Sequence, residues 1–332
     1  MISIYLCQMD SLHPAFKAMN ALAKAAEPFL FVLDFALREP IVKPLSELDS
    51  NTLKFQIGSL TNSKAQKDIF EKESEFSYLP LDKEVYRKAF EKVLFHLRRG
   101  DSYLLNLTMP VRLKTDLKLE EIYARSKAPY KLWLRDRFTV FSPEPFVKIN
   151  DGKIFTYPMK GTIDANLPDA EQILLADPKE KAEHYTIVDL LRNDLNSVAE
   201  NVRVDRFRYV EKIQTSRGAL LQTSSAISGK LPANYTDELG TIFSKLLPAG
   251  SISGAPKKRT IELIQEAENY NRGFYTGVMG VFDGKNLESS VMIRFIEQDN
   301  EGLVFKAGGG ITVNSQCESE YKELLQKVYL PF

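Results

Sequence analysis

The sequence predicts an α+β fold, in which antiparallel β-sheets are flanked by helices. Two observations carry this prediction. Turn signals of the Asp-Gly type, Asn150-Asp151-Gly152 and Asp283-Gly284, lie between apolar runs and are typical of hairpins, which join antiparallel strands. Segments with helical periodicity separate these hairpins, and we find neither a βαβ rhythm nor an internal repeat.

The first 80 residues are predicted to be a short N-terminal region packed on the main domain. Residues 81–332 would then form the catalytic domain, since no glycine/serine-rich linker separates the two parts. The elements expected in the first part are a helix at Ala15–Ala26, strands at Phe29–Phe35 and Leu53–Leu60, and a loop or exposed helix at Lys64–Ser77.

The clearest helix is predicted at Lys83–Arg99. Its apolar residues recur at helical spacing, and Gly100 is a suitable C-terminal stop. The next segment, Ser102–Thr108, is predicted to be a buried strand that Pro110 ends.

The remaining elements follow from hairpin signals and helical periodicity. We expect strands at Phe146–Ile149, Lys153–Tyr157, Gly277–Phe282, Ser289–Glu297 and Leu303–Ala307, and helices at Pro178–Asn193, Pro256–Asn269 and Glu318–Val328.

Composition excludes several classes of function. Lysine plus arginine equals aspartate plus glutamate, at 44 each, which gives no electrostatic case for nucleic acid or for a membrane surface. The two cysteines and three histidines form no metal-binding pattern and imply no disulfide. The N-terminus lacks the features of a signal peptide, and no apolar run is long enough to span a bilayer, so we expect a soluble cytoplasmic protein.

Two Glu-x-x-Glu pairs are candidates for a metal site. Glu180 and Glu183 share one face of a predicted helix, and so do Glu320 and Glu323. Four carboxylates that converge would suit Mg²⁺, which prefers oxygen ligands. Each pair taken alone is more typical of a solvated charged face.

Glycine-rich turns are candidates for anion binding. The run Gly308-Gly309-Gly310 could present backbone N–H groups at a turn, or could simply be flexible. A second turn, Pro248–Lys257, enters a helix whose N-terminus could hold an anion, although its spacing is not that of a P-loop.

Lys160-Gly161-Thr162 lies at the end of a predicted strand. Its amine, its backbone without a Cβ and its hydroxyl could together contact a small ligand. Glu144 ends another strand sixteen residues earlier. Lys160 read alone could be no more than a point charge for an anion.

These residues belong to a series of motifs that resembles the chorismate-utilising enzymes. The resemblance extends from about Lys83 to Val328, and the motifs occur in the family's order. They are GDSYLLNLT, FSPEPF, YPMKGT, KAEHYTIVDLLRNDL, LPAGSISGAPKKRTIELI, GFYTGVMG, VMIRF and AGGGITVNSQCESEYKE. The resemblance implies the fold of anthranilate synthase component I, with antiparallel β-sheets packed as a sandwich and flanked by helices.

Within this family, Lys160 separates two activities. Anthranilate synthases typically have alanine in a PIAGT motif, and aminodeoxychorismate synthases typically have lysine in PIKGT; this chain has PMKGT. The resemblance is therefore closest to aminodeoxychorismate synthase component I, also called para-aminobenzoate synthase component I. It implies a Mg-dependent, transaminase-type amination of chorismate to 4-amino-4-deoxychorismate, for 4-aminobenzoate and folate. The alternatives are anthranilate synthase component I, of tryptophan biosynthesis, and an inactive homologue that serves as a binding or scaffold subunit.

The resemblance also implies roles for individual residues. Lys160 would attack ring carbon 2 of chorismate while Glu144, as general acid, protonates the leaving 4-hydroxyl; ammonia would then displace the lysine. Because only a neutral amine attacks, we expect a lowered pKa for Lys160. Mg²⁺ would be bound by Glu183 and Glu323, with Glu180 and Glu320 supporting it through water. The implied substrate-binding residues are Gly161, Thr162, Ser251, Tyr275, Arg294, Gly308, Gly309, Gly310 and Lys327.

Two departures from the family pattern, and the source of nitrogen, complete the expectations. Leu104 stands where many members have Gln, or Lys as a base for water, which argues against hydration chemistry. Gln222 stands where many have histidine. Neither Cys7 nor Cys317 lies in the nucleophile-elbow setting of a glutamine amidotransferase. We therefore expect ammonia from a separate glutamine amidotransferase subunit, in a heterodimer, and a separate aminodeoxychorismate lyase downstream.

Overall fold

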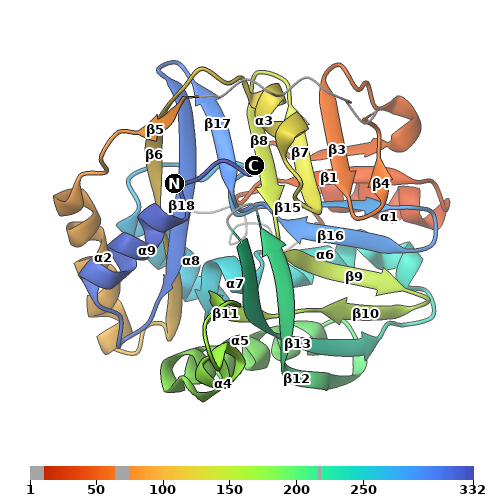
Figure 1. The fold of residues 1–332 in the computed structure, drawn as a ribbon. Coiled ribbons are helices and arrows are strands. Elements are labelled where there is room, and N and C mark those ends of the chain that lie inside the picture. Colours follow the sequence, from red (N-terminus) through yellow and green to blue (C-terminus); the bar gives the residue numbers. More distant parts are fainter. Residues whose placement is uncertain (1–10, 64–74, 216–217) are drawn as a thin grey trace.

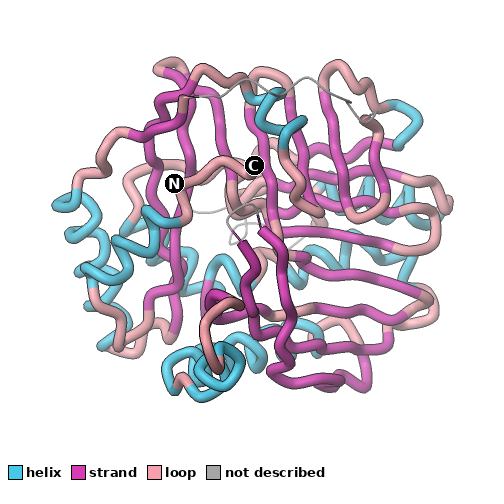
Figure 2. Tube along the Cα trace, in the orientation of Figure 1, coloured by secondary structure: helices cyan, strands magenta, loops and turns pink. Residues whose placement is uncertain are grey.

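Two antiparallel β-sheets form the body of the protein (Figure 1). The computed structural model describes residues 11–63, 75–215 and 218–332. Each sheet has nine strands, and every strand pairing in them is antiparallel within the described residues. Helices lie on the outside of the strands (Figure 2). The predicted α+β class is confirmed.

The first sheet has the order β11-β13-β10-β9-β16-β15-β1-β2, and β12 pairs with β13. Its strands are β11 (Met159–Asp164), β13 (Gly218–Lys230), β10 (Lys153–Thr156), β9 (Pro145–Asn150), β16 (Leu287–Val291), β15 (Val278–Phe282), β1 (Phe29–Leu33), β2 (Ile41–Pro44) and β12 (Glu200–Thr215).

The second sheet has the order β14-β6-β18-β17-β8-β7-β3-β4, and β5 pairs with β6. Its strands are β14 (Gly254–Ala255), β6 (Leu104–Thr115), β18 (Gly302–Ile311), β17 (Phe295–Asp299), β8 (Phe138–Ser142), β7 (Tyr130–Leu134), β3 (Leu53–Ile57), β4 (Leu60–Thr61) and β5 (Phe76–Tyr78).

The helices follow the sheets in chain order. They are α1 (Pro14–Lys24), α2 (Lys83–Arg98), α3 (Leu119–Arg125), α4 (Ala170–Ala176), α5 (Pro178–Asn196), α6 (Leu239–Leu246), α7 (Gly250–Ser253), α8 (Lys257–Ala267) and α9 (Cys317–Gln326), with 3₁₀ turns at Leu45–Glu47 and Tyr235–Glu238.

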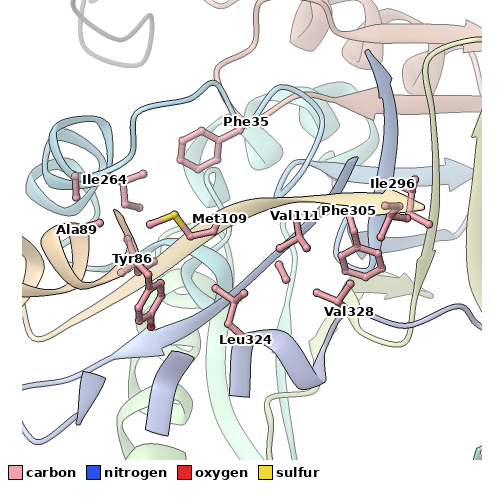
Figure 3. Close-up of a cluster of buried hydrophobic side chains, with 14 of the residues drawn as sticks. Phe35, Tyr86, Ala89, Met109, Val111, Ile264, Ile296, Phe305, Leu324 and Val328 are labelled. Carbon is pink, nitrogen blue, oxygen red and sulfur yellow. The ribbon is translucent and has the colours of Figure 1, made fainter. Parts of the chain in front are cut away.

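Three apolar clusters hold these layers together. One joins the two sheets face to face: Val32 and Met279 of the first sheet pack with Phe55 and Val140 of the second, as in a sandwich. The second cluster lies between the first sheet and helices α1 and α6. The third packs α2, α8 and α9 against β6 and β18, where Tyr86, Met109 and Leu324 are examples (Figure 3). Burying each such side chain contributes about 1.5–3 kcal/mol.

The helix predicted at Lys83–Arg99 is α2, and its ends show why it forms there. The Asp82 side chain accepts hydrogen bonds from the backbone N–H groups of Glu84 and Val85, at 2.8 and 3.4 Å, and so caps the N-terminus. Gly100 follows the helix with φ of 78°, a left-handed conformation that glycine adopts without strain.

The hairpin predicted at residues 146–157 is also confirmed, as β9 and β10. Asp151 and Gly152 both have positive φ, at 47° and 72°, as expected for the turn that matches strand twist. The last strand of this hairpin leads directly into β11, which carries Lys160.

Several predicted boundaries were wrong. The expected strand Ser289–Glu297 is two strands, β16 and β17, which belong to different sheets. The triple glycine is part of strand β18 and pairs with residues 106–108, so it is no turn. Pro110 does not end β6; it pairs with Lys306 in a stretch whose described partner is β18 alone, and a strand edge tolerates proline. Pro256 caps α8 rather than lying in its first turn.

The described strands that precede residue 80 lie at the ends of the two sheets. β1 and β2 end the first sheet, and β3 and β4 end the second (Figure 1). The boundary at residue 80 stays a prediction. Most of the stretch predicted as a loop or exposed helix, residues 64–74, lies outside the described residues, as does Cys7, while its end forms β5.

Candidate active site

Charged side chains from both sheets line one cavity of about 460 Å³. The first sheet contributes β11, with support from α5, and the second contributes β18, with α9 beside it. The lining residues are Met159, Lys160, Gly161, Thr162, Glu180, Glu183, Gln222, Arg294, Gly310, Glu320, Glu323, Gln326, Lys327 and Tyr329. The cavity therefore gathers Lys160 and both predicted glutamate pairs.

Lys160 lies on β11, where the strand has an irregularity between Lys160 and Thr162. Gly161, with φ of 78°, makes this conformation possible. A Cβ on this residue would come within 3.0 Å of Glu180 Oε2, so glycine also gives that carboxylate its place. The Thr223 hydroxyl donates to the Lys160 carbonyl and fixes the backbone.

The Lys160 amine is bound to a carboxylate. Its Nζ lies 2.5 Å from Glu183 Oε2, and the two side chains are 31% and 14% exposed. Burial lowers the pKa of Lys160, but the negative charges of Glu183, Glu180 and Glu323 outweigh burial, so the pKa lies above its ordinary value. The expectation of a lowered pKa was wrong for this arrangement, because the sequence did not show that the carboxylates surround the amine.

A second lysine and glutamate face the cavity from the other sheet. Lys327, which follows α9, lies 2.8 Å from Glu323 Oε1 and donates to the Gly308 carbonyl at 2.9 Å. Burial lowers the pKa of Lys327; Glu323 opposes this effect, and the charges of Arg294 and Lys160 add to it. A Cβ on Gly309 would lie 3.4 Å from Lys327 Nζ and 3.6 Å from Glu323 Oε1, so β18 offers bare backbone to this end of the cavity.

Glu144 lies between β8 and β9, beside the cavity rather than in its lining. Burial raises the pKa of its carboxyl, although the Ser251 hydroxyl and the charges of Arg294 and Lys160 act in the opposite direction. The Glu144 carbonyl accepts a hydrogen bond from Ser290 at 2.7 Å, which holds the backbone. A carboxyl with a raised pKa keeps its proton to higher pH, as a general acid requires.

Arg294 connects the two sheets, because it lies between β16 and β17. Its φ of 56° is uncommon for a residue with a side chain. Tyr275 is buried nearby against Phe295, with ring centroids 5.9 Å apart, and does not line the cavity. The sequence therefore brought Arg294 into the site but placed Tyr275 one layer behind it.

The two departures from the family pattern have different positions. Leu104 lies on β6, and one of its methyl groups would be 3.1 Å from a Cβ on Gly310, so an apolar group backs this strand. Gln222 lines the cavity itself and is opposite Thr162 on β13. His184, next to Glu183, is buried, and its Nε2 lies 2.7 Å from the Ser225 hydroxyl oxygen.

The donor set suits a hard divalent cation, although the side chains here are arranged otherwise. All four glutamates line the cavity, and carboxylate oxygens are the ligands that Mg²⁺ prefers. Within the described residues, no three His, Cys, Asp or Glu side chains are grouped as a metal site. Glu183 and Glu323 are paired instead with the ammonium groups of Lys160 and Lys327, which are positive charges at the same oxygens.

Sequence reasoning missed several residues of the lining. Gln326 and Tyr329 come at and beyond the end of the last helix, in a stretch without a motif. Met159 adjoins Lys160, and Gln222 stood out only as a departure. Helical spacing from Glu323 could have indicated Gln326 and Lys327, which follow it by three and four residues.

No helix in the described part of the chain is long and apolar enough to cross a membrane.

Comparison with known proteins identifies relatives over nearly the whole chain. The family model described as chorismate binding enzyme matches residues 42–331. An uncharacterized PabA-like protein of Pasteurella multocida is 52% identical over 321 residues, which cover 97% of this chain and 99% of that protein. Aminodeoxychorismate synthase component 1 of Klebsiella aerogenes is 34% identical over 265 residues, which cover 75% of this chain and 57% of that protein.

A solved structure agrees with the fold. Anthranilate synthase component I from Streptococcus pneumoniae superimposes with a TM-score of 0.66 and 26% identity, over 79% of this chain and 60% of that one. The chain thus spans little more than half the length of its named synthase relatives.

Proposed function

This chain belongs to the chorismate-binding enzyme family, and we propose that it is an aminodeoxychorismate synthase component I. The proposed reaction is the amination of chorismate at ring carbon 4, which gives 4-amino-4-deoxychorismate for 4-aminobenzoate and folate synthesis. The similarity to the synthase of Klebsiella aerogenes supports the proposal.

One observation carries the choice within the family. Lys160 of the PMKGT motif places its amine inside the acidic cavity, 2.5 Å from Glu183, rather than on the surface. An amine at this position can attack a bound ring, and the alanine typical of anthranilate synthases cannot.

The proposed first step joins enzyme and substrate. The neutral Lys160 amine attacks ring carbon 2, the ring double bonds shift, and the bond from carbon 4 to its hydroxyl breaks. Glu144 gives its proton to the departing oxygen, so that water leaves rather than hydroxide. The raised pKa of Glu144 supports this role.

In the second step, ammonia attacks carbon 4 and the bond from carbon 2 to Lys160 breaks as the double bonds shift back. Two displacements retain the configuration at carbon 4. The net reaction consumes chorismate and ammonia and releases water and the aminated product.

Charges around the cavity are proposed to hold the substrate. Arg294 is suited to the enolpyruvyl carboxylate, because a guanidinium binds carboxylates through two hydrogen bonds. Lys327 and the backbone of Gly308, Gly309 and Gly310 would contact a carboxylate at the other end. Gly161 and Thr162 would line the ring, and Tyr275 and Ser251 would support Arg294 and Glu144 from behind.

Glu183 and Glu323 would hold Mg²⁺, with Glu180 and Glu320 supporting through water. When bound, the cation would neutralise and orient the ring carboxylate and would reduce the negative charge that raises the pKa of Lys160.

The nitrogen is proposed to come from a separate glutamine amidotransferase subunit. Cys317 does not suit glutaminase chemistry: its pKa is raised, mainly by burial, whereas a nucleophilic cysteine needs a lowered pKa. A separate lyase would convert the product to 4-aminobenzoate.

The test is product identification. The chain is incubated with chorismate, magnesium and ammonium, and the product is separated and identified by mass and by its chemistry with a lyase. We expect 4-amino-4-deoxychorismate, and no product after chelation of magnesium. Activity that persists after full chelation would remove the metal roles of Glu183 and Glu323.

A second candidate is anthranilate synthase component I, because a solved structure of that name is 26% identical to this chain. Anthranilate formed from chorismate and ammonium without a lyase would favour it and would contradict the first proposal.

A further inference from the structure

Arg294 has an unusual environment for a charged side chain in a polar cavity. Within the described residues it forms no ion pair; its printed side-chain partner is a phenol, since Arg294 Nε donates to the Tyr329 hydroxyl oxygen at 3.1 Å. The guanidinium carbon also lies 5.6 Å from the centroid of the Tyr329 ring. Both residues line the cavity.

The backbone holds Arg294 at a cost. A residue other than glycine at φ of 56° stores on the order of 1–3 kcal/mol of strain, which must be balanced by the surrounding structure. The Arg294 carbonyl accepts a hydrogen bond from Phe141 N–H at 3.1 Å, which ties the crossover between β16 and β17 to β8. The base of the side chain is thus fixed, while its long chain still needs a partner at the tip.

Tyr329 is itself well anchored. It follows Val328 and precedes Leu330, and both of these side chains are buried. Its ring packs against Phe141, with centroids 6.3 Å apart. The residue that fixes Arg294 at its backbone therefore also supports the phenol that fixes its tip.

The choice of a phenol has a chemical consequence. A carboxylate partner would neutralise the guanidinium and would compete with an anionic ligand, whereas a neutral hydroxyl orients it and leaves its positive charge. Because Nε is used by Tyr329, the two Nη groups remain, and in the described part of the chain they have no hydrogen-bond partner. Two Nη groups in one plane are the fork that binds both oxygens of a carboxylate.

We propose that Tyr329 is a positioning residue that aims the Nη fork of Arg294 at a substrate carboxylate and so sets substrate affinity. This inference rests on the proposed function only in taking chorismate as the carboxylate ligand. Tyr329 acts on the substrate through Arg294, so its removal weakens binding and leaves the chemistry at Lys160 unchanged.

The test measures binding directly, by calorimetric titration of the protein with chorismate in the presence of magnesium. Tyr329→Phe keeps the ring and removes the hydroxyl; we expect Kd to rise about tenfold, the usual size for a hydrogen bond to a charged group. Under turnover, KM should rise to a similar extent while kcat stays within about twofold. Tyr321→Phe is the matched control: it also removes a tyrosine hydroxyl, one that donates to the Leu81 carbonyl at 2.7 Å on α9, and should leave Kd unchanged.

A double-mutant cycle separates positioning from general stability. Arg294→Lys keeps the charge but lacks the Nε–H, so Tyr329→Phe should have almost no further effect on Kd in that background. An unchanged Kd in Tyr329→Phe, or effects that simply multiply, would overturn the inference. If the wild-type protein binds chorismate but forms no 4-amino-4-deoxychorismate, the proposed function fails and the Tyr329 inference stands or falls on the cycle alone; no chorismate binding at all would overturn both.

Discussion

Two lysine–glutamate pairs face each other across the cavity, one from each sheet, and they differ in a way that matters for chemistry. Lys160 and Glu183 belong to the first sheet and its helix α5, with 2.5 Å between their charged atoms. Lys327 and Glu323 belong to the end of α9, at 2.8 Å. Burial lowers the pKa of both lysines, yet the result is a raised pKa for Lys160 and a lowered one for Lys327.

The difference lies in the second ring of charges. Lys160 is also close to Glu180 and Glu323, so negative charge dominates; Lys327 has Arg294 and Lys160 nearby, so positive charge reinforces burial. An amine in a buried site therefore takes its protonation state from its neighbours rather than from burial alone. The nucleophile that we propose is the more acid-stabilised of the two lysines, and it can react only after the negative charge around it has been reduced.

The largest expected effect breaks the comparison at Lys160. Lys160→Ala should reduce formation of 4-amino-4-deoxychorismate by more than about 10⁴-fold, as for other enzymes that lose their nucleophile. Anthranilate is expected in its place, because ammonia can then reach ring carbon 2. Product analysis by chromatography gives both rates.

Lys327→Ala serves as the control for this variant, because it removes an equal charge from the opposite wall. It should keep the product identity. If Lys160→Ala kept both its rate and its product, the two lysines would be equivalent and the assignment of a nucleophile would be wrong.

The next effect concerns Glu144, which lies near both lysines. Glu144→Gln should lower kcat by roughly 10²–10⁴-fold, the usual contribution of a general acid. Because its folded pKa is raised, the wild-type carboxyl is protonated to higher pH than an ordinary glutamate, and kcat should fall as pH rises through that value. A kcat measured against pH should lose this alkaline limb in Glu144→Gln; an unchanged limb would assign it to another group.

The residues of the two pairs could be named from sequence, because the motifs place a lysine beside a glycine and glutamates three residues apart. Local signals of the same kind predicted α2, through Asp82 and Gly100, and the hairpin at Asp151 and Gly152. Each of these depends on a few neighbouring residues whose conformational preferences agree.

What failed depends on contacts between distant segments. No local signal separates β16 from β17, since both are apolar and the sheet that each one joins is decided by partners far away in sequence. The long pair β12 and β13, which supports β11, was not predicted for the same reason. The direction of the Lys160 pKa and the place of Tyr329 in the cavity also depend on elements that only the fold brings together.

A third effect tests what supports the first pair from behind. His184 adjoins Glu183, and its Nε2 lies 2.7 Å from the Ser225 hydroxyl oxygen. Burial lowers its pKa from 6.5 to about 4, and the charges of Arg208 and Lys160 contribute. The unfolded chain thus binds more protons between these pH values, so His184 should remove about 3 kcal/mol of unfolding free energy as pH falls from 7 to 4.

Urea unfolding at pH 7 and pH 4 measures this linkage. His184→Gln should show a pH dependence that is smaller by about 3 kcal/mol. Ser225→Ala keeps the imidazole and loses one partner, so it should lower stability at pH 7 and retain most of the pH dependence. Equal pH dependence in His184→Gln and wild type would mean that this histidine titrates normally.

The smallest effect is expected at the second pair and sharpens the contrast with the first. Lys327→Met removes the ion pair with Glu323 and the hydrogen bond to the Gly308 carbonyl, but no reacting atom. We therefore expect KM for chorismate to rise about tenfold, the equivalent of one charge-assisted contact, with kcat within about twofold. Lys322→Met, on the exposed face of the same helix, is the matched control and should change neither constant. Steady-state kinetics decides the matter: a fall in kcat as large as that of Lys160→Ala would give both lysines a part in the chemistry, because a residue that only holds the substrate contributes equally to the ground state and the transition state.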